Sequence, residues 1–112
     1  PVTGIYDLND GPTLEGRAFD DAWVDVERAA DGTTTTTFTR PDGIEVKIIG
    51  DETINAWQCY TATGAPFAEH PYGIAVEPMT APANAFRTGD HFVTLAPNGD
   101  YTTVVRYEVV QK

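Results

Sequence analysis

Glu77 stands where a carboxylate could serve as a general base. It follows the apolar run at 73–76 (GIAV) and directly precedes Pro78, which we expect to end the strand. A carboxylate held rigidly at the rim of a sheet can take a proton from a bound substrate. A solvated glutamate at a strand terminus is the alternative interpretation, and spacing alone favours it.

Asp20 and Asp21 form an adjacent acidic pair shortly before Trp23. In an extended segment, successive side chains point to opposite faces, so only one of the two carboxylates can address a given pocket. A carboxylate beside an aromatic ring is a common arrangement in sugar sites. The ring covers the apolar face of the sugar, and the carboxylate accepts hydrogen bonds from its hydroxyl groups. An aspartate at a turn or strand entry is the commoner alternative.

The remaining reactive side chains carry less signal. His70 lies in a proline-rich loop and His91 near a short strand, and each could be a general acid or metal ligand. Because they are isolated and far apart in the sequence, solvated or structural roles are favoured. Cys59 is the single cysteine, which excludes an internal disulfide and a cysteine zinc cage. Cys59 and its neighbours Trp57 and Tyr60 are interpreted as core residues, and no metal site is expected.

Charge excludes two classes of partner. The chain has 112 residues, 17 acidic and 7 basic, giving a net charge of −10. Nucleic acids and anionic membranes both attract basic surfaces, so neither is an expected partner. The length suits one domain, and the hydrophobic content of 41% indicates that the domain is globular. The sequence contains no phosphate-binding or dinucleotide-binding motif, so no cofactor is expected, and the single cysteine favours a cytoplasmic setting.

Short β-rich runs separated by turn residues position these side chains. Alternation or β-branched content predicts strands at 22–28, 33–39, 44–49, 54–61, 74–77, 92–95 and 101–110. The first three are expected to form two hairpins, with Asp31-Gly32 as the first turn. Residues 1–18 read as an ordered connecting segment and 64–72 as a loop. Residues 79–89 are expected to be irregular, and 97–100 to form a turn. The pattern predicts an all-β antiparallel sandwich or barrel.

One stretch is similar to a known family. Residues 73–109 contain Gly73, Ile74, Ala75, Val76, Glu77, Pro78, Met79, Thr80, Pro82, Asn84, Ala85 and Phe86 in a fixed order. This resembles the G-(LI)-A-V-E-P-M-T-x-P-x-N-A-F motif at the C-terminal end of the aldose 1-epimerase (galactose mutarotase) family. Gly89, Leu95, Pro97 and Gly99 resemble the family's next turn, with Asn98 inserted. Thr3-Gly4 and 19–23 resemble its upstream segments, so the similarity covers nearly all of the chain.

The resemblance implies a fold and a reaction. The fold would be an antiparallel β-sandwich of the galactose mutarotase type, with residues 1–112 forming its C-terminal part and the N-terminal part absent. The reaction would interconvert the α and β anomers of free aldohexoses without a cofactor. A base takes the proton of the anomeric hydroxyl, an acid protonates the ring oxygen, and the opened sugar rotates and closes again.

Residue by residue, Glu77 matches the family's catalytic base and Asp20 the aspartate that binds sugar hydroxyls. Asp21 fills a variable position and receives no role. The family's general-acid histidine lies upstream of the matched region, and neither His70 nor His91 aligns with it. The resemblance therefore predicts that the 112-residue chain is inactive by itself. We also expect it to self-associate, or to pair with the missing N-terminal part, because a cut sandwich exposes sheet edges.

Two other functions stay open. A non-catalytic carbohydrate-binding β-sandwich shares the short strands, acidic surface and aromatic residues. A structural or interaction domain without a ligand site is the third interpretation. Fold-level similarity alone does not choose among them.

Overall fold

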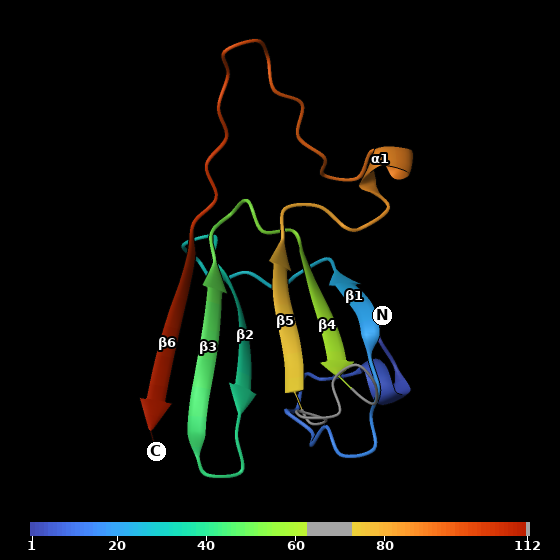
Figure 1. The fold of residues 1–112 in the computed structure, drawn as a ribbon, viewed down its shortest axis with the longest axis vertical. Coiled ribbons are helices and arrows are strands. Elements are labelled where there is room, and N and C mark those ends of the chain that lie inside the picture. Colours follow the sequence, from blue (N-terminus) through green and yellow to red (C-terminus); the bar gives the residue numbers. More distant parts are fainter. Residues whose placement is uncertain (63–72, 112) are drawn as a thin grey trace.

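The computed structural model describes residues 1–62 and 73–111, and these residues form an all-β structure. The predicted loop at 64–72, with His70, lies outside the described residues. Along the chain, the elements are a 3-10 turn η1 (Gly4–Tyr6), β1 (Asp20–Val24), β2 (Thr34–Thr39), β3 (Ile44–Gly50), β4 (Ala56–Ala62), β5 (Gly73–Met79), α1 (Ala85–Thr88) and β6 (Val105–Gln111). Their arrangement is shown in Figure 1.

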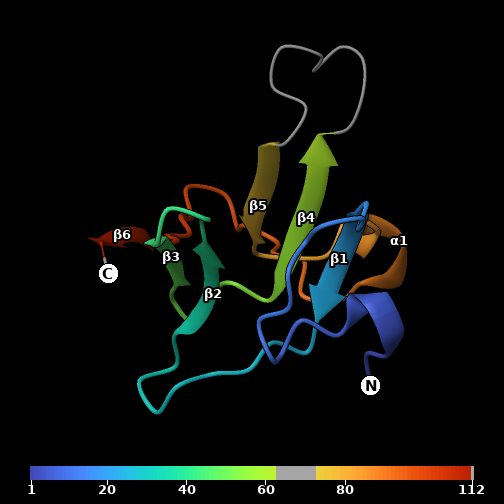
Figure 2. The same ribbon diagram turned by 90° about the horizontal axis from the view of Figure 1, so that it is seen from below.

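The strands form two antiparallel three-stranded sheets. Their orders are β1-β4-β5 and β2-β3-β6, so β4 and β3 are the central strands. Seen from below, the two sheets stand next to each other with the end of β2 leading into β3 and the chain then crossing to β4 (Figure 2). β2 and β3 are joined by a tight turn, in which the Gly43 N–H donates to the carbonyl of Arg40 at 3.0 Å.

A small buried cluster joins the sheets. Trp57 of β4 and Ile48 of β3 pack with Ile54, which lies in the connection between these strands and is only 1% exposed. The Trp57 indole N–H donates to the Thr34 hydroxyl of β2 at 3.2 Å, so the buried polar atom is satisfied across the interface. Gly50 has no side chain where Ile54 packs: a Cβ there would lie 2.4 Å from Ile54 Cγ1.

The predicted hairpin between 22–28 and 33–39 is wrong. The first strand ends at Val24, because Asp25 adopts a positive φ of 53° that interrupts an extended ladder. β1 instead pairs with β4, and the following segment crosses to the other sheet. Arg28 fixes this crossing, since its guanidinium donates to the carbonyls of Gly32 at 3.0 Å and Ile54 at 2.7 Å.

Three further strand predictions need correction. Pro78 does not end β5, which continues to Met79. A proline is tolerated there because β5 is an edge strand whose outer N–H groups need no partner. The predicted strand at 92–95 is not a strand, and 101–104 precede β6 instead of forming its first half. The predictions for β2 and β3 are confirmed within one residue, and the buried strand predicted at 54–61 is β4, two residues later at its start.

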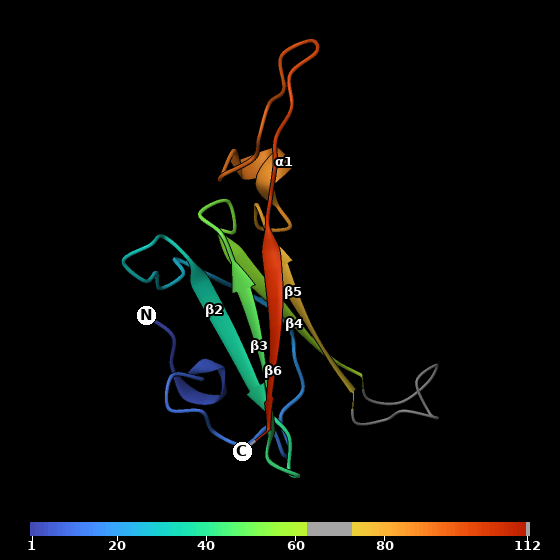
Figure 3. The same ribbon diagram turned by 90° about the vertical axis from the view of Figure 1, so that its left-hand side faces the viewer.

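The segment from α1 to β6 extends away from both sheets (Figures 1 and 3). No strand of the described residues pairs with it, and its apolar side chains are largely in solvent. Phe86 is 96% exposed and contacts Phe92 with ring centroids 6.4 Å apart. The predicted turn at 97–100 is present, with Asn98 at φ 63° and the Gly99 N–H donating to the Ala96 carbonyl at 2.8 Å.

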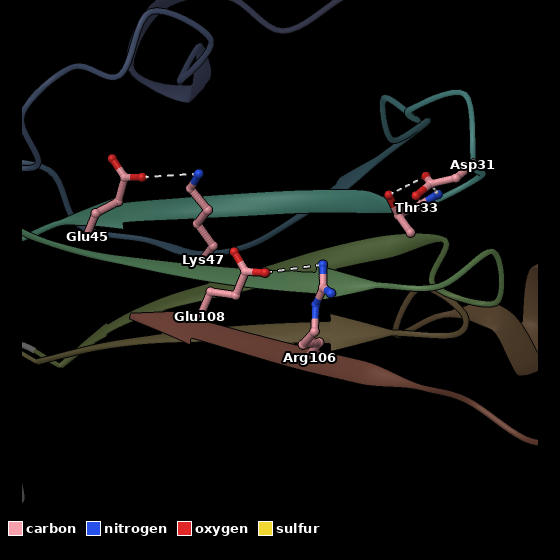
Figure 4. A network of polar contacts seen from close by, with 6 residues as sticks. All are labelled: Asp31, Thr33, Glu45, Lys47, Arg106 and Glu108. Atoms are coloured by element: carbon pink, nitrogen blue, oxygen red, sulfur yellow. Dashed lines mark hydrogen bonds and ion pairs between the residues drawn. The ribbon is translucent and has the colours of Figure 1, made fainter. Parts of the chain in front are cut away.

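The two faces of the β2-β3-β6 sheet differ in polarity. The face that carries Ile48 turns toward the core, whereas the other carries charged side chains from β3 and β6 (Figure 4). On this outer face Lys47 lies 3.4 Å from Glu45, and Arg106 lies 3.3 Å from Glu108. The side chains of Arg106 and Glu108 are 66% and 42% exposed, so their pair contributes little to stability, whereas the Glu45 side chain is largely buried.

We predict that Ile54→Ala destabilises the chain by about 2–5 kcal/mol, the usual cost of a buried cavity. The measurement is urea unfolding followed by tryptophan fluorescence. Ile49→Ala is the matched control, because Ile49 is half-buried on the outer face. Equal losses from the two substitutions would contradict the assignment of Ile54 to the core.

We also predict a pH-dependent role for Asp51. Hydrogen bonds from the Thr53 hydroxyl and from backbone N–H groups lower the pKa of Asp51. One of these donors is the Val104 N–H at 2.9 Å, so the carboxylate holds the start of β6. A carboxyl group whose pKa is lower in the folded than in the unfolded state stabilises the folded state at pH values above its unfolded pKa. That stabilisation is lost as the pH falls through its folded-state pKa.

Accordingly, Asp51→Asn should lower the urea midpoint at pH 7, and the difference from wild type should vanish well below pH about 4. Glu52→Gln, at an exposed neighbouring position, serves as control and should leave the midpoint nearly unchanged at both pH values. A difference for Asp51→Asn as large in acid as at neutrality would show that the charge is not responsible.

Candidate functional site

The two carboxylates singled out by sequence lie on one face of the β1-β4-β5 sheet. Asp20 of β1 is directly opposite Tyr60 of β4, and Glu77 of β5 is directly opposite Gln58 of β4. Directly paired residues in a sheet project to the same side, and so do residues two apart along one strand. Tyr60 and Gln58 are two apart, so all four side chains share one face.

Gln58 lies between the two carboxylates on the central strand. Its amide nitrogen donates to Asp20 Oδ1 at 2.9 Å, a diagonal contact between neighbouring strands. Glu77 occupies the position beside it on the other flank. Sequence reasoning missed Gln58, because it lies 38 positions from Asp20 and only the pairing of β1 with β4 brings the two side chains together. The alternation within 54–61 could have indicated only that Gln58 faces away from Trp57.

This face is polar and open to water. Asp20 and Glu77 are exposed, while Gln58 and Tyr60 are half-buried. From strand spacing and the two-residue offset, the Cα atoms of Asp20 and Glu77 are about 12 Å apart. Their side chains therefore flank a strip centred on β4, where a polyhydroxylated ligand could accept a hydrogen bond from the second N–H of the Gln58 amide and donate to both carboxylates. We refer to Asp20, Gln58, Tyr60 and Glu77 as the carboxylate face.

Asp21 projects to the opposite face, as the alternation predicts. It lines a hollow of about 290 Å³ together with Trp23 and Tyr6. The Trp23 indole N–H donates to the Tyr6 carbonyl at 2.9 Å, and the buried Phe19 ring meets Trp23 edge-on at 5.3 Å between centroids. The carboxylate beside an aromatic ring is thus Asp21 with Trp23, and Asp20 is not part of this hollow. Tyr6 comes from the N-terminal segment and had no sequence signal.

A second hollow of about 590 Å³ lies between the sheets. Its walls are mainly apolar, with Phe38, Val46 and Ile48 on one side and Ile74 and Val76 on the other. It lies next to the buried cluster around Trp57, with which it shares Ile48. Neither Asp20 nor Glu77 lines either hollow.

Of the two histidines, His91 lies within the described residues. His91 has a positive φ of 58° and an exposed side chain, and it belongs to the segment between α1 and β6 that extends away from both sheets (Figure 1). Within the described ranges, no group of three or more His, Cys, Asp and Glu side chains is placed to hold a metal ion. Across residues 1–62 and 73–111, no helix has the length and apolar character needed to cross a membrane.

Cys59 faces the core side of β4 and is 5% exposed. Burial raises the pKa of its thiol, and the nearby charge of Glu77 raises it further. Because the thiolate is the nucleophilic form, both effects keep Cys59 unreactive. The interpretation of Trp57 and Cys59 as core residues is confirmed, whereas Tyr60 lies on the opposite, half-exposed face.

Comparisons with protein-family models, curated proteins and solved structures give no match for this chain.

Proposed function

We propose that this chain supplies the base and one sugar ligand of an aldose 1-epimerase-type isomerase. The observation that carries the proposal is the common face of Asp20 and Glu77. Two residues separated by 57 positions, each matching a functional position of the resembled family, project from the flanking strands of one three-stranded sheet. The proposal includes a β-sandwich of the galactose mutarotase type and a cytoplasmic location.

The chemistry assigns one step to each side chain. The Glu77 carboxylate takes the proton of the anomeric hydroxyl, while Asp20 accepts a hydrogen bond from another hydroxyl and so fixes the orientation of the ring. The Gln58 amide, already bonded to Asp20 at 2.9 Å, holds that carboxylate in position. The ring oxygen must be protonated by an acid outside the matched residues, so the 112-residue chain binds a hexose weakly without turning it over.

A non-catalytic carbohydrate-binding module is the second candidate. It is favoured by the hollow that combines the Asp21 carboxylate with the Trp23 and Tyr6 rings, an arrangement suited to stacking on the apolar face of a sugar. The two candidates place the sugar on opposite faces of the same sheet, and only the epimerase needs the anomeric hydroxyl to be free.

Titration with D-glucose and with methyl α-D-glucoside, monitored by amide chemical shifts, separates the two candidates. For the epimerase-type site, glucose should shift Asp20, Gln58 and Glu77, and the glucoside should bind roughly tenfold more weakly, because it lacks the hydroxyl that Glu77 accepts from. Glu77→Gln should weaken glucose binding and remove this preference, whereas Glu52→Gln should do neither. A binding module predicts shifts at Trp23 and Tyr6 and equal affinities in all variants. No saturable shifts would exclude both functions.

Polarimetry of fresh α-D-glucose tests the predicted inactivity. With the 112-residue chain present, rotation should change at the spontaneous rate. A faster rate that is lost in Glu77→Gln would contradict the claim that a general acid is missing, while supporting Glu77 as the base.

A further inference from the structure

β6 presents an exposed edge with a distinctive sequence. Among the described strands it pairs with β3 alone, so it ends the β2-β3-β6 sheet. Its core-facing row is apolar but poorly covered: Tyr107 is 63% and Val109 69% exposed. Unprotected edges with apolar side chains favour pairing with another strand. Two charged residues on the other face of β6, Arg106 and Glu108, determine which strand fits.

The ladder pattern shows which backbone groups of β6 point outward. The Arg40 N–H donates to the Ile44 carbonyl, so in the alternating antiparallel pattern the even-numbered residues of β3 bond to β2. The odd-numbered residues then bond to β6, in agreement with the Asp51 N–H donating to the Val104 carbonyl at 3.1 Å. The N–H and C=O groups of Val105, Tyr107 and Val109 therefore point away from β3.

We propose that β6 pairs antiparallel with β6 of a second copy, about a two-fold axis at Tyr107. In that register Tyr107 faces its own equivalent, and Val105 faces Val109 of the other copy. The outward backbone groups then form the hydrogen-bonded pairs. The result is a continuous six-stranded sheet in which the exposed apolar rows of the two copies lie side by side. Isologous contacts of this kind are the usual basis of homodimers.

Charge complementarity selects this register and this partner. Arg106 faces Glu108 of the second copy, twice by symmetry, at the closer non-hydrogen-bonded positions where Cα atoms are about 4.5 Å apart. If one strand slides by two residues relative to the other, Arg106 faces Arg106 of the second copy, or Glu108 faces Glu108. Both of these registers bring like charges together. Both side chains lie on the outer face with their ends in solvent, 66% and 42% exposed, and are available for exchange (Figure 4).

The other edges are less suited to self-pairing. β5 contains Pro78, which lacks an N–H, and β1 carries Asp20 and Asp21 without a cation, so two copies of it would repel each other. β2 is an uncharged threonine-rich strand, which provides no charge pair to set a register. In a chain with net charge −10, the locally neutral Arg106–Glu108 pair makes β6 the strand on which a second copy fits best.

Single charge reversals and their mixture test the proposal by sedimentation equilibrium of the 112-residue chain. Wild type should dimerise. Arg106→Glu and Glu108→Arg should each dimerise roughly ten- to hundredfold more weakly, because each places like charges opposite each other at both symmetric positions. An equimolar mixture should form a heterodimer, since the all-acidic β6 of one variant then faces the all-basic β6 of the other. Arg40→Glu and Asp42→Arg make the same charge changes in the exposed β2–β3 turn and should dimerise like wild type.

A monomeric wild type, unchanged affinity in the single variants, or a mixture that stays monomeric would overturn the proposal. Circular dichroism of each variant checks that the strand still folds, and recovery in the mixture itself excludes misfolding as the cause.

Cysteine cross-linking tests the register separately. In a Cys59→Ser background, Tyr107→Cys should form an intermolecular disulfide on mild oxidation, because Cα atoms about 5.5 Å apart are within disulfide range. Val109→Cys faces Val105 of the other copy and should not cross-link. Efficient cross-linking of Val109→Cys, or none at Tyr107→Cys, would overturn the register.

Discussion

The structure depends on the contact between Trp57 and the two isoleucines Ile48 and Ile54. A three-stranded sheet is unstable unless one face is buried, and here each sheet buries its face against the other through this one cluster. The bond from the Trp57 indole to Thr34 makes the contact directional, because the buried N–H is satisfied only in this orientation. Because Gly50 has no Cβ, Ile54 can fill the space beside it.

The position of Trp57 on the central strand also decides where the carboxylate face lies. Because β4 turns Trp57 and Cys59 inward, its alternation turns Gln58 and Tyr60 outward, and the paired strands contribute Asp20 and Glu77 to the same side. The packing that stabilises the fold and the polar face proposed to bind sugar are thus opposite sides of one strand. Their geometry is coupled without any direct contact between them.

The limited extent of the cluster explains the exposed apolar surface. Burial is complete around Ile54, but the hollow between Phe38 and Ile74 and the apolar row of β6 extend beyond it. Among the described residues, apolar side chains are therefore buried near Ile54 and exposed along β6. The self-complementary order of charges on β6 is the feature from which we propose that a second copy pairs with this edge.

The sequence by itself determined the local features: the all-β class, the β2–β3 hairpin, the Asn98 turn, and the opposite directions of Asp20 and Asp21. These follow from β-branched content, turn residues and the two-residue period of a strand. Only the tertiary structure decided that β1 pairs with β4, that β5 continues through Pro78, and that Gln58 lies between Asp20 and Glu77. Strand pairing joins residues distant in sequence, so it depends on which faces are buried together, and no local pattern encodes that choice.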